Sequence, residues 1–251
     1  MKAYEARHYL LKAELRWEKV EDRSRYPYAL PALAGLHEID FHPKVTFLVG
    51  ENGSGKSTLI EALAVAWGFN AEGGTRNFRF GTRSSHSPLH AALRLIKGVR
   101  RARDGFFLRA ESYFNAATYI ENLDDAPGGP RVIESYGGKS LHEQSHGESF
   151  LALLEHRLGG KGLYIFDEPE AALSPARQLS MLVRMHELIA ADSQFIIATH
   201  SPILMAYPDA WIYQFGPQGL ERVAYQDTDH FSVTRSFLNN HRAMLDQLLK
   251  D

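Results

Sequence analysis

Residues 50–57, GENGSGKS, satisfy the pattern G-x-x-x-x-G-K-[ST], which is typical of a loop that holds phosphate groups. Glycines let the backbone curl so that successive amides point at one anion, and a helix beginning there adds the positive field of its N-terminus. Lys56 would reach the β- and γ-phosphates, and the Ser57 hydroxyl would complete a Mg²⁺ shell. The nucleotide-binding residues expected from this loop are Asn52, Gly53, Ser54, Gly55, Lys56, Ser57 and Thr58.

Two adjacent carboxylates, Asp167 and Glu168, end a second apolar run, LYIFDEP. Asp167 could hold Mg²⁺, and Glu168 could orient or deprotonate the water that attacks the γ-phosphate. Carboxylates at the carboxyl end of one strand, opposite a phosphate loop from a neighbouring strand, match the ligand-binding edge of an open α/β sheet. Alone, such a pair could be a simple turn; together with the loop it favours phosphate chemistry.

Two further segments indicate a function only in combination with these motifs. His200 ends the apolar run FIIATHSP, 33 residues after Asp167, where an imidazole could contact the γ-phosphate and position water. The alternative is an ordinary polar residue. In QSHGESF, Ser145 could cap a helix whose N-terminus Gly147 leaves open to an anion. By itself this segment is only a helix start.

The elements that must position these residues alternate between buried strands and helices, which predicts an α/β fold with a parallel sheet. Alternation in residues 9–17 indicates a half-buried strand, and the continuous run VTFLV a fully buried one. A hairpin is expected in 211–225 and a helical segment at 231–249. Further helices are expected at 57–67, 88–103, 147–158 and 175–191, and further strands in FFLRAES, GLYIFDEP and SQFIIATHSP.

The composition, 251 residues with 44% hydrophobic and 23% charged, suits one large core or a core with a smaller subdomain. The chain has no cysteine, which excludes disulfides and thiolate metal sites. It shows neither a membrane-spanning apolar run nor a signal peptide, so we expect a cytoplasmic protein without direct membrane insertion.

Charge is unevenly distributed although the net charge is only −2. The segment 76–109 contains nine Arg or Lys and one acid, Asp104. Such an excess could attract the phosphate backbone of a nucleic acid. The alternative is a solvated face that acids elsewhere in the fold balance.

Taken together, the motifs resemble those of the ABC-class ATPase family across residues 45–202. GENGSGKS is similar to its Walker A motif, SHGES to its signature, LYIFDEP to its Walker B motif with the catalytic glutamate, EAALS to its D-loop, and His200 to its switch histidine. This resemblance implies a P-loop NTPase core of the ABC type, with a mainly parallel sheet, an N-terminal antiparallel β part and a small helical subdomain. We expect a single domain, 1–251, with its core at about 1–110 and 160–251 and the helical, signature-bearing subdomain at about 111–159.

The resemblance also implies ATP and Mg²⁺ as ligands, and a head-to-tail homodimer on ATP binding, in which Ser145 and Gly147 contact the partner's nucleotide. The sequence departs from the family pattern at His146, where a glycine is common. It also lacks a glutamine before Gln144, so the usual Q-loop glutamine is missing. Glu111 is the best replacement as a Mg²⁺ contact, ahead of Ser112, and Tyr26 and Tyr28 are the candidates for stacking on adenine.

Within the family, the THSP strand end and the acidic signature look more like the soluble RecF- and SMC-like branch and similar stand-alone predicted bacterial ATPases. The 89 residues from Lys56 to Ser145 are too few for an SMC-type coiled coil. The resulting prediction is an ATP-hydrolysing switch in nucleic-acid maintenance or defence, which contacts nucleic acid through 76–109 or acts with an unknown protein partner.

Three alternatives stay open at this point. The chain could be the nucleotide-binding subunit of a membrane transporter, although the absent Q-loop glutamine argues against that coupling. A non-hydrolysing ATP sensor is disfavoured because Lys56, Glu168 and His200 are all present. A small-molecule kinase would need neither SHGES nor a switch histidine.

Overall fold

The computed structural model describes residues 8–75, 87–110, 133–134, 138 and 146–250. Its centre is a six-stranded sheet in the order β5-β6-β7-β3-β8-β9, parallel throughout except for the antiparallel pair β8–β9. The strands are β3 (Val45–Gly50), β5 (Asp104–Arg109), β6 (Gly162–Asp167), β7 (Gln194–Ala198), β8 (Trp211–Gly216) and β9 (Gly219–Val223). This arrangement confirms the predicted α/β fold with a mainly parallel sheet.

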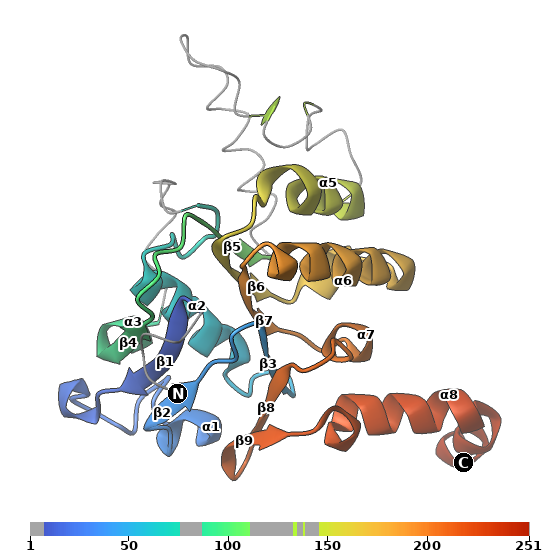
Figure 1. Ribbon diagram of the computed structural model, residues 1–251. Helices are drawn as coiled ribbons and strands as arrows, with labels where there is room; N and C mark the ends of the chain where they lie inside the picture. The colour runs from blue at the N-terminus through green and yellow to red at the C-terminus, as the bar shows by residue number, and fades with distance from the viewer. Residues whose placement is uncertain (1–7, 76–86, 111–132, 135–137, 139–145, 251) are drawn as a thin grey trace.

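Helices cover both faces of this sheet, which Figure 1 views along its edge. One face carries α2 (Lys56–Trp67), and the other carries α5 (His146–Ala152), α6 (Pro175–Ala190) and α7 (Pro202–Met205). Strands β3, β6 and β7 are buried along their whole length because both of their faces are covered. Side chains on each strand alternate between the two cores: Phe47 packs on the α6 side and Leu48 on the α2 side.

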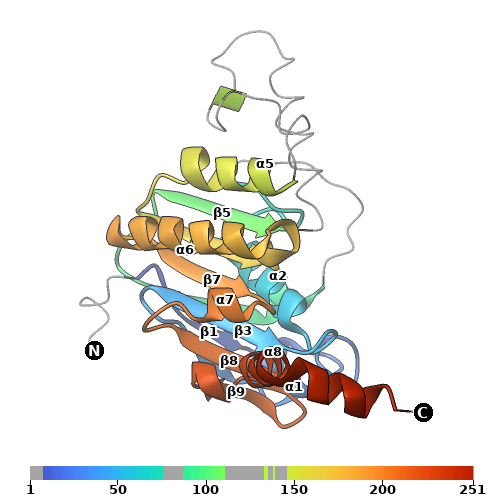
Figure 2. The same ribbon diagram turned by 90° about the vertical axis from the view of Figure 1, so that its right-hand side faces the viewer.

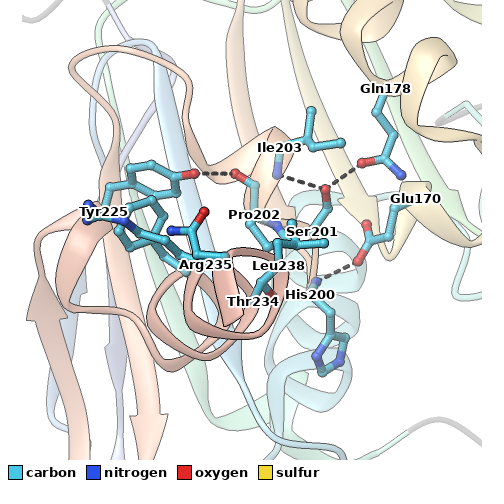
Figure 3. A pocket seen from close by; sticks show the side chains of 12 residues that line it. Glu170, Gln178, His200, Ser201, Pro202, Ile203, Tyr225, Thr234, Arg235 and Leu238 are labelled. Carbon is cyan, nitrogen blue, oxygen red and sulfur yellow. Dashed lines mark hydrogen bonds between the residues drawn. The ribbon is translucent and has the colours of Figure 1, made fainter. Parts of the chain in front are cut away.

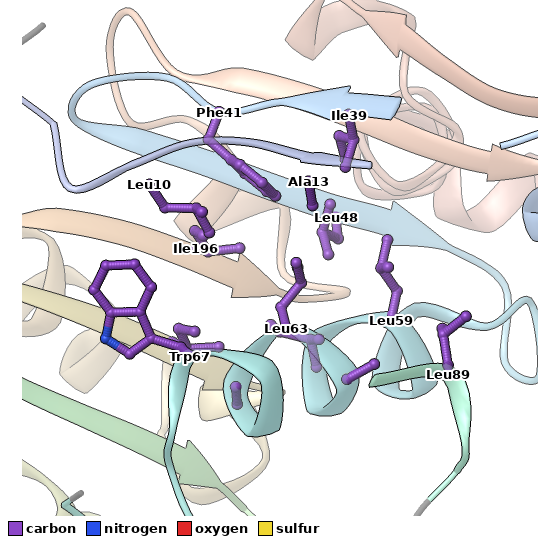
Figure 4. Packing of buried hydrophobic residues seen from close by; sticks show 14 of the residues in the cluster. Leu10, Ala13, Ile39, Phe41, Leu48, Leu59, Leu63, Trp67, Leu89 and Ile196 are labelled. Carbon is purple, nitrogen blue, oxygen red and sulfur yellow. The ribbon is translucent and has the colours of Figure 1, made fainter. Parts of the chain in front are cut away.

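A second, three-stranded antiparallel sheet in the order β2-β1-β4 lies beyond α2. It consists of β1 (Leu10–Leu15), β2 (Glu38–Asp40) and β4 (Leu93–Lys97). Leu10, Ala13 and Ile39 point from it toward Leu59 and Leu63 of α2, as Figure 4 shows. Helix α2 is therefore packed between two sheets, which fixes the phosphate loop at its N-terminus. The antiparallel N-terminal part that the sequence predicts is confirmed.

The prediction of a helix at 88–103 is wrong. Only α3 (Leu89–Ala92) is helical, and the chain then enters β4. Leu93 and Leu95 pair with Leu15 and Ala13 of β1, and both pack against the α2 core. The apolar spacing of this segment fits either element, and pairing with a strand about 80 residues earlier in the chain decides between them.

The remaining short helices connect these layers and are α1 (Pro31–Ala34), η1 (Trp17–Lys19), η3 (Leu153–Arg157), η4 (Pro169–Ala172) and η5 (Tyr225–Asp227). The chain ends in α8 (Asp229–Leu248), which extends away from the sheet in both views and has no buried residue (Figures 1 and 2). Across the described ranges, no helix combines the length and the apolar character needed to cross a membrane. Most of residues 111–145 lie outside the described ranges, so the proposed subdomain boundaries stay a prediction.

Candidate active site

The phosphate loop connects β3 to α2 and depends on glycine at several points. Gly50, Gly53 and Gly55 have φ values of 145°, 78° and 106°, which side-chain-bearing residues rarely adopt. At Gly50 there is also no room, because a Cβ atom would lie 2.7 Å from the Phe215 carbonyl oxygen on β8. The loop is thus built for a curled backbone at the start of a 12-residue helix, as the motif predicts. Asn52 lies exposed on this loop.

Lys56, the first residue of α2, folds its side chain back over the loop. Its Nζ donates to the carbonyl oxygens of Gly50, at 2.8 Å, and Glu51, at 2.9 Å, and the residue is buried. Burial lowers the pKa of Lys56, while the carboxylates of Glu168 and Asp167 oppose that shift. The ammonium group is therefore held by the loop, close enough to both carboxylates for them to act on its charge.

Ser57 and Asp167 meet across the site. The Ser57 hydroxyl donates to Asp167 Oδ1 at 3.1 Å, and Asp167 is buried at the end of β6. One carboxylate beside one hydroxyl fits Mg²⁺, which takes few protein ligands and completes its shell with water and phosphate oxygens. No group of three or more His, Cys, Asp or Glu that could hold a metal occurs among the described residues. The Ser54 Oγ atom is buried and makes no hydrogen bond in the described part of the chain.

Glu168 directly follows β6, and His200 lies just beyond the end of β7. These two strands are neighbours in the sheet, and β7 also pairs with β3. Glu168 adopts the left-handed conformation, with φ 51° and ψ 52°, and its amide donates to the Ala198 carbonyl at 2.9 Å. Its Oε1 lies 3.4 Å from His200 Nε2. The strand order thus brings the phosphate loop, Asp167, Glu168 and His200 to one edge of the sheet.

Glu170 holds the backbone around His200. Its two carboxylate oxygens accept from the His200 amide, shown in Figure 3, and from the Thr199 hydroxyl at 2.8 Å. Burial raises the pKa of Glu170 even though these hydrogen bonds oppose the shift. Glu170 and His200 also line one end of a cavity of about 560 Å³ that reaches Tyr225 and Leu238 (Figure 3).

Two residues of this site were not expected from the sequence. Arg109, at the end of β5, pairs with Glu61 of α2 at 2.6 Å, and its Nε lies 3.8 Å from Asp167 Oδ2. His230 of α8 places its Nε2 atom 3.0 Å from His200 Nδ1. The register of β5 and β6 sets Arg109 beside Asp167, so correct pairing of these two strands would have indicated the first residue. No sequence pattern indicates His230.

The signature residues occupy a different part of the molecule. Gly147 is the second residue of α5, and a Cβ atom there would collide with the Arg177 side chain and lie 2.9 Å from the Ala172 carbonyl oxygen. Close packing on η4 and α6 is therefore one reason for glycine at 147. Ser145 and Glu111 lie outside the described residues.

The two tyrosines considered for the adenine base differ in position. Tyr26 is 63% exposed, and its hydroxyl shares a 2.8 Å hydrogen bond with the Thr58 hydroxyl in the first turn of α2. Tyr28 instead packs against Trp17, with 6.1 Å between ring centroids. Of the two, Tyr26 is the one with an exposed ring at the phosphate loop.

Much of the described basic segment is paired with acids. Arg94 lies 3.7 Å from Glu14, Arg100 lies 3.6 Å from Asp192, and Arg109 faces the active site. Arg76, Arg79 and Arg83 are outside the described residues. Arg101, Arg103 and Lys161 line a hollow of about 440 Å³ together with Arg100, Asp192 and Tyr9. This hollow adjoins the start of β5 and β6, at the end of the sheet opposite Asp167.

Fold and site together define a P-loop NTPase. The family model described as "AAA domain" matches residues 33–106, and the model described as "AAA domain, putative AbiEii toxin, Type IV TA system" matches residues 149–206. The chain has the fold of an ABC-type ATPase, and its matches to ATPase domains and to an ATP-binding protein support ATP hydrolysis as its activity. The two family models cover the phosphate loop and the segment containing Asp167, Glu168 and His200.

Individual similar proteins include transport ATP-binding proteins and an SMC head. The chain is 28% identical to the "Probable branched-chain amino acid transport ATP-binding protein LivG" of Archaeoglobus fulgidus, over 66% of this chain and 72% of that protein. It is similar to the structure of cbiO1 from Clostridium perfringens, part of the ABC transporter complex cbiONQ, with 17% identity, coverage of 94% and 97%, and a TM-score of 0.52. An SMC head bound to the C-winged helix domain of ScpA matches with 15% identity, coverage of 74% and 92%, and a TM-score of 0.43.

Proposed function

We propose that this ATPase works by closing two copies head to tail around ATP and Mg²⁺, and that its cycle serves as a switch in nucleic-acid maintenance or defence. The observation that carries the proposal is the convergence of Lys56, Ser57, Asp167, Glu168 and His200 at one sheet edge. Each of these groups has the chemistry that triphosphate hydrolysis requires.

When ATP binds, Lys56 would give up its hydrogen bonds to the two loop carbonyls and bind the β- and γ-phosphate oxygens. The loop glycines would let the backbone that carries these carbonyls adjust. Ser57 and Asp167 would hold Mg²⁺, which neutralises charge on the phosphates when bound. Glu111 remains our proposal for a further metal contact, through water or directly. The proposed adenine contact is Tyr26, on the evidence of its exposed ring beside Thr58.

Glu168 would accept a proton from the water that attacks the γ-phosphorus, as its carboxylate stands at the strand end beyond the metal-binding aspartate. His200 would donate from Nε2 to a γ-phosphate oxygen and keep that water in line. His200 Nε2 lies 3.4 Å from Glu168 Oε1, which supports a site where both side chains contact the attacking water and the γ-phosphate.

The position of the signature supports the proposed dimer closure. Helix α5 packs against η4 and α6, over the part of the sheet formed by β5 and β6. The phosphate loop follows β3, and β6 and β7 lie between β5 and β3 in the sheet. A chain is therefore poorly placed to bring Gly147 to its own nucleotide. A second copy related by a twofold axis would supply Ser145 and Gly147 to it.

Support for the nucleic-acid or defence role is of two kinds. The family model over residues 149–206 is described by a toxin of a type IV toxin–antitoxin system. The hollow lined by Arg100, Arg101, Arg103 and Lys161 has the charge to contact a phosphate backbone. An unidentified protein partner on the same surface would fit the same switch.

A membrane transporter subunit is the second candidate, favoured by the likeness to the LivG and cbiO1 proteins. Steady-state ATP hydrolysis by the purified protein, with and without single- and double-stranded DNA and RNA, separates the two, with Glu168→Gln as the blank. Stimulation of several-fold by one nucleic acid supports the first. Turnover that ignores all of them, together with co-purification of a hydrophobic membrane protein, would replace it with the second.

A further inference from the structure

We infer that His230 is a positioning residue for ATP hydrolysis: it fixes the orientation and the protonated nitrogen of His200. The inference rests on the proposed role of His200 and adds the first turn of α8 to the site. Nothing in the motif pattern assigns a role to His230, which lies 30 residues after His200 in the chain.

The two imidazoles form a short chain that ends at Glu168. His200 Nδ1 lies 3.0 Å from His230 Nε2, with 5.2 Å between ring centroids. The opposite nitrogen of His200, Nε2, is buried and lies 3.4 Å from Glu168 Oε1, without a hydrogen bond among the described residues. The remaining nitrogen, His230 Nδ1, is buried and makes no hydrogen bond within the part of the chain that the structure describes.

Only one direction of this hydrogen bond suits the site. If His230 Nε2–H donates, neutral His200 carries its hydrogen on Nε2 and presents a donor to Glu168 and to a γ-phosphate oxygen. If His200 Nδ1–H donates instead, the bare Nε2 lone pair faces a carboxylate and would face a phosphate, and both arrangements are repulsive. We therefore assign the donor role to His230, because it gives His200 the hydrogen at the position where the reaction needs it.

The surroundings of His230 favour its neutral form. Burial lowers the pKa of His230, and the adjacent His200 lowers it further. The other charged groups that act on it are Glu51 and Lys56 of the phosphate loop and Asp229 on its own helix. A neutral His230 keeps the single donor and the single acceptor that the assigned hydrogen bond requires.

The first turn of α8 is fixed to the segment that follows His200. Thr228 caps α8 by accepting from the Phe231 amide, and its hydroxyl donates to the Tyr225 carbonyl at 2.8 Å. The Tyr225 hydroxyl donates to the Pro202 carbonyl at 2.9 Å, as Figure 3 shows. Pro202 is two residues after His200, so these hydrogen bonds tie the start of α8 to the segment that carries His200. A side chain anchored in this way can orient its partner.

Long-range ¹H–¹⁵N spectra of nucleotide-free protein with ¹⁵N-labelled histidine, at pH 8, test the assignment directly. His200→Ala and His230→Leu assign the signals. We expect both rings to carry hydrogen on Nε2, and the His200 Nδ1 signal to shift in His230→Leu because it loses a donor. Hydrogen on Nδ1 of His200 would overturn the inference. This result is independent of turnover, so it stands apart from any failure of the proposed function.

Kinetics supply the second test. His230→Leu should lower kcat about 10- to 100-fold, the cost typical of losing the partner that orients a metal-ligating histidine, with little change in KM for ATP. His230→Gln can place an N–H donor near the position of Nε2 and should retain turnover within a few-fold. His241→Leu, an exposed histidine on the same helix, is the matched control and should behave as wild type. Equal losses in His230→Gln and His230→Leu would contradict the inference.

Discussion

Gln194 joins the two sheets that enclose α2, and its replacement tests how the phosphate loop is supported. The side chain is fully buried at the start of β7. Its Oε1 accepts from the amides of Tyr9 and Leu10 at 3.0 and 2.9 Å, and its Nε2 donates to the carbonyls of Leu10 and His42 at 2.8 and 3.1 Å. One amide group therefore pairs four backbone groups of the N-terminal part of the chain.

Gln194→Ala leaves these four backbone groups without their partner in the interior. Each unpaired buried group costs about 1–3 kcal/mol, and relaxation of the surrounding backbone recovers part of the total. We expect a loss of about 4 kcal/mol in the free energy of unfolding. In a chain of this size that loss lowers Tm by roughly 8–16 °C.

Gln194→Glu is the more specific test, because it keeps the shape of the side chain and the oxygen that accepts from the Tyr9 and Leu10 amides. Its second oxygen faces the Leu10 and His42 carbonyls, so burial and repulsion raise the pKa of the introduced carboxyl in the folded state. A folded pKa above the unfolded one means that the destabilisation is complete above the folded pKa and fades as pH falls below it.

Thermal unfolding followed by circular dichroism at pH 5 and pH 8 measures both variants. Gln247→Ala, an exposed residue of α8, is the control and should change stability by no more than about 0.5 kcal/mol. A Gln194→Ala protein that melts within about 2 °C of wild type would refute the anchoring role. So would a Gln194→Glu protein with the same loss of Tm at both pH values.

Three other predictions address ligands. Lys56→Ala should abolish ATP binding in a nucleotide titration, and retained affinity would refute the phosphate-loop assignment. Tyr26→Ala should raise KM for ATP several-fold while Tyr26→Phe, which keeps the ring, changes it little; equal effects would exclude stacking. Changing Arg100, Arg101 and Arg103 to Glu should weaken nucleic-acid binding roughly tenfold or more at 0.1 M salt, and unchanged affinity would return this surface to a simple solvated face.

The sequence predicted those parts of the molecule that local patterns define. Buried strands β3, β6 and β7 are continuous apolar runs, and each motif follows its strand directly, so the site edge of the sheet could be inferred without coordinates. Hydrophobic spacing also located α2 and α6 to within a residue or two at each end.

What the sequence did not predict depends on contacts between distant segments. The 88–103 segment becomes a strand because β1 pairs with it. The charge pattern groups Arg109 with the basic segment 76–109, yet strand register sets it beside Asp167. His230 reaches the site because the segment before α8 is hydrogen-bonded, through Tyr225, to Pro202 at the start of α7. These arrangements follow from packing, which no local pattern encodes.

ATP-dependent dimerisation is the central claim of the proposed function, and the mass of Glu168→Gln in solution measures it most directly. Light scattering should give one chain, 28.3 kDa, without nucleotide and twice that mass with saturating ATP and Mg²⁺, since closure would no longer end in hydrolysis. Lys56→Ala under the same conditions is the control and should stay at one chain. A Glu168→Gln protein that binds ATP and remains a monomer would contradict the head-to-tail closure proposed for this ATPase.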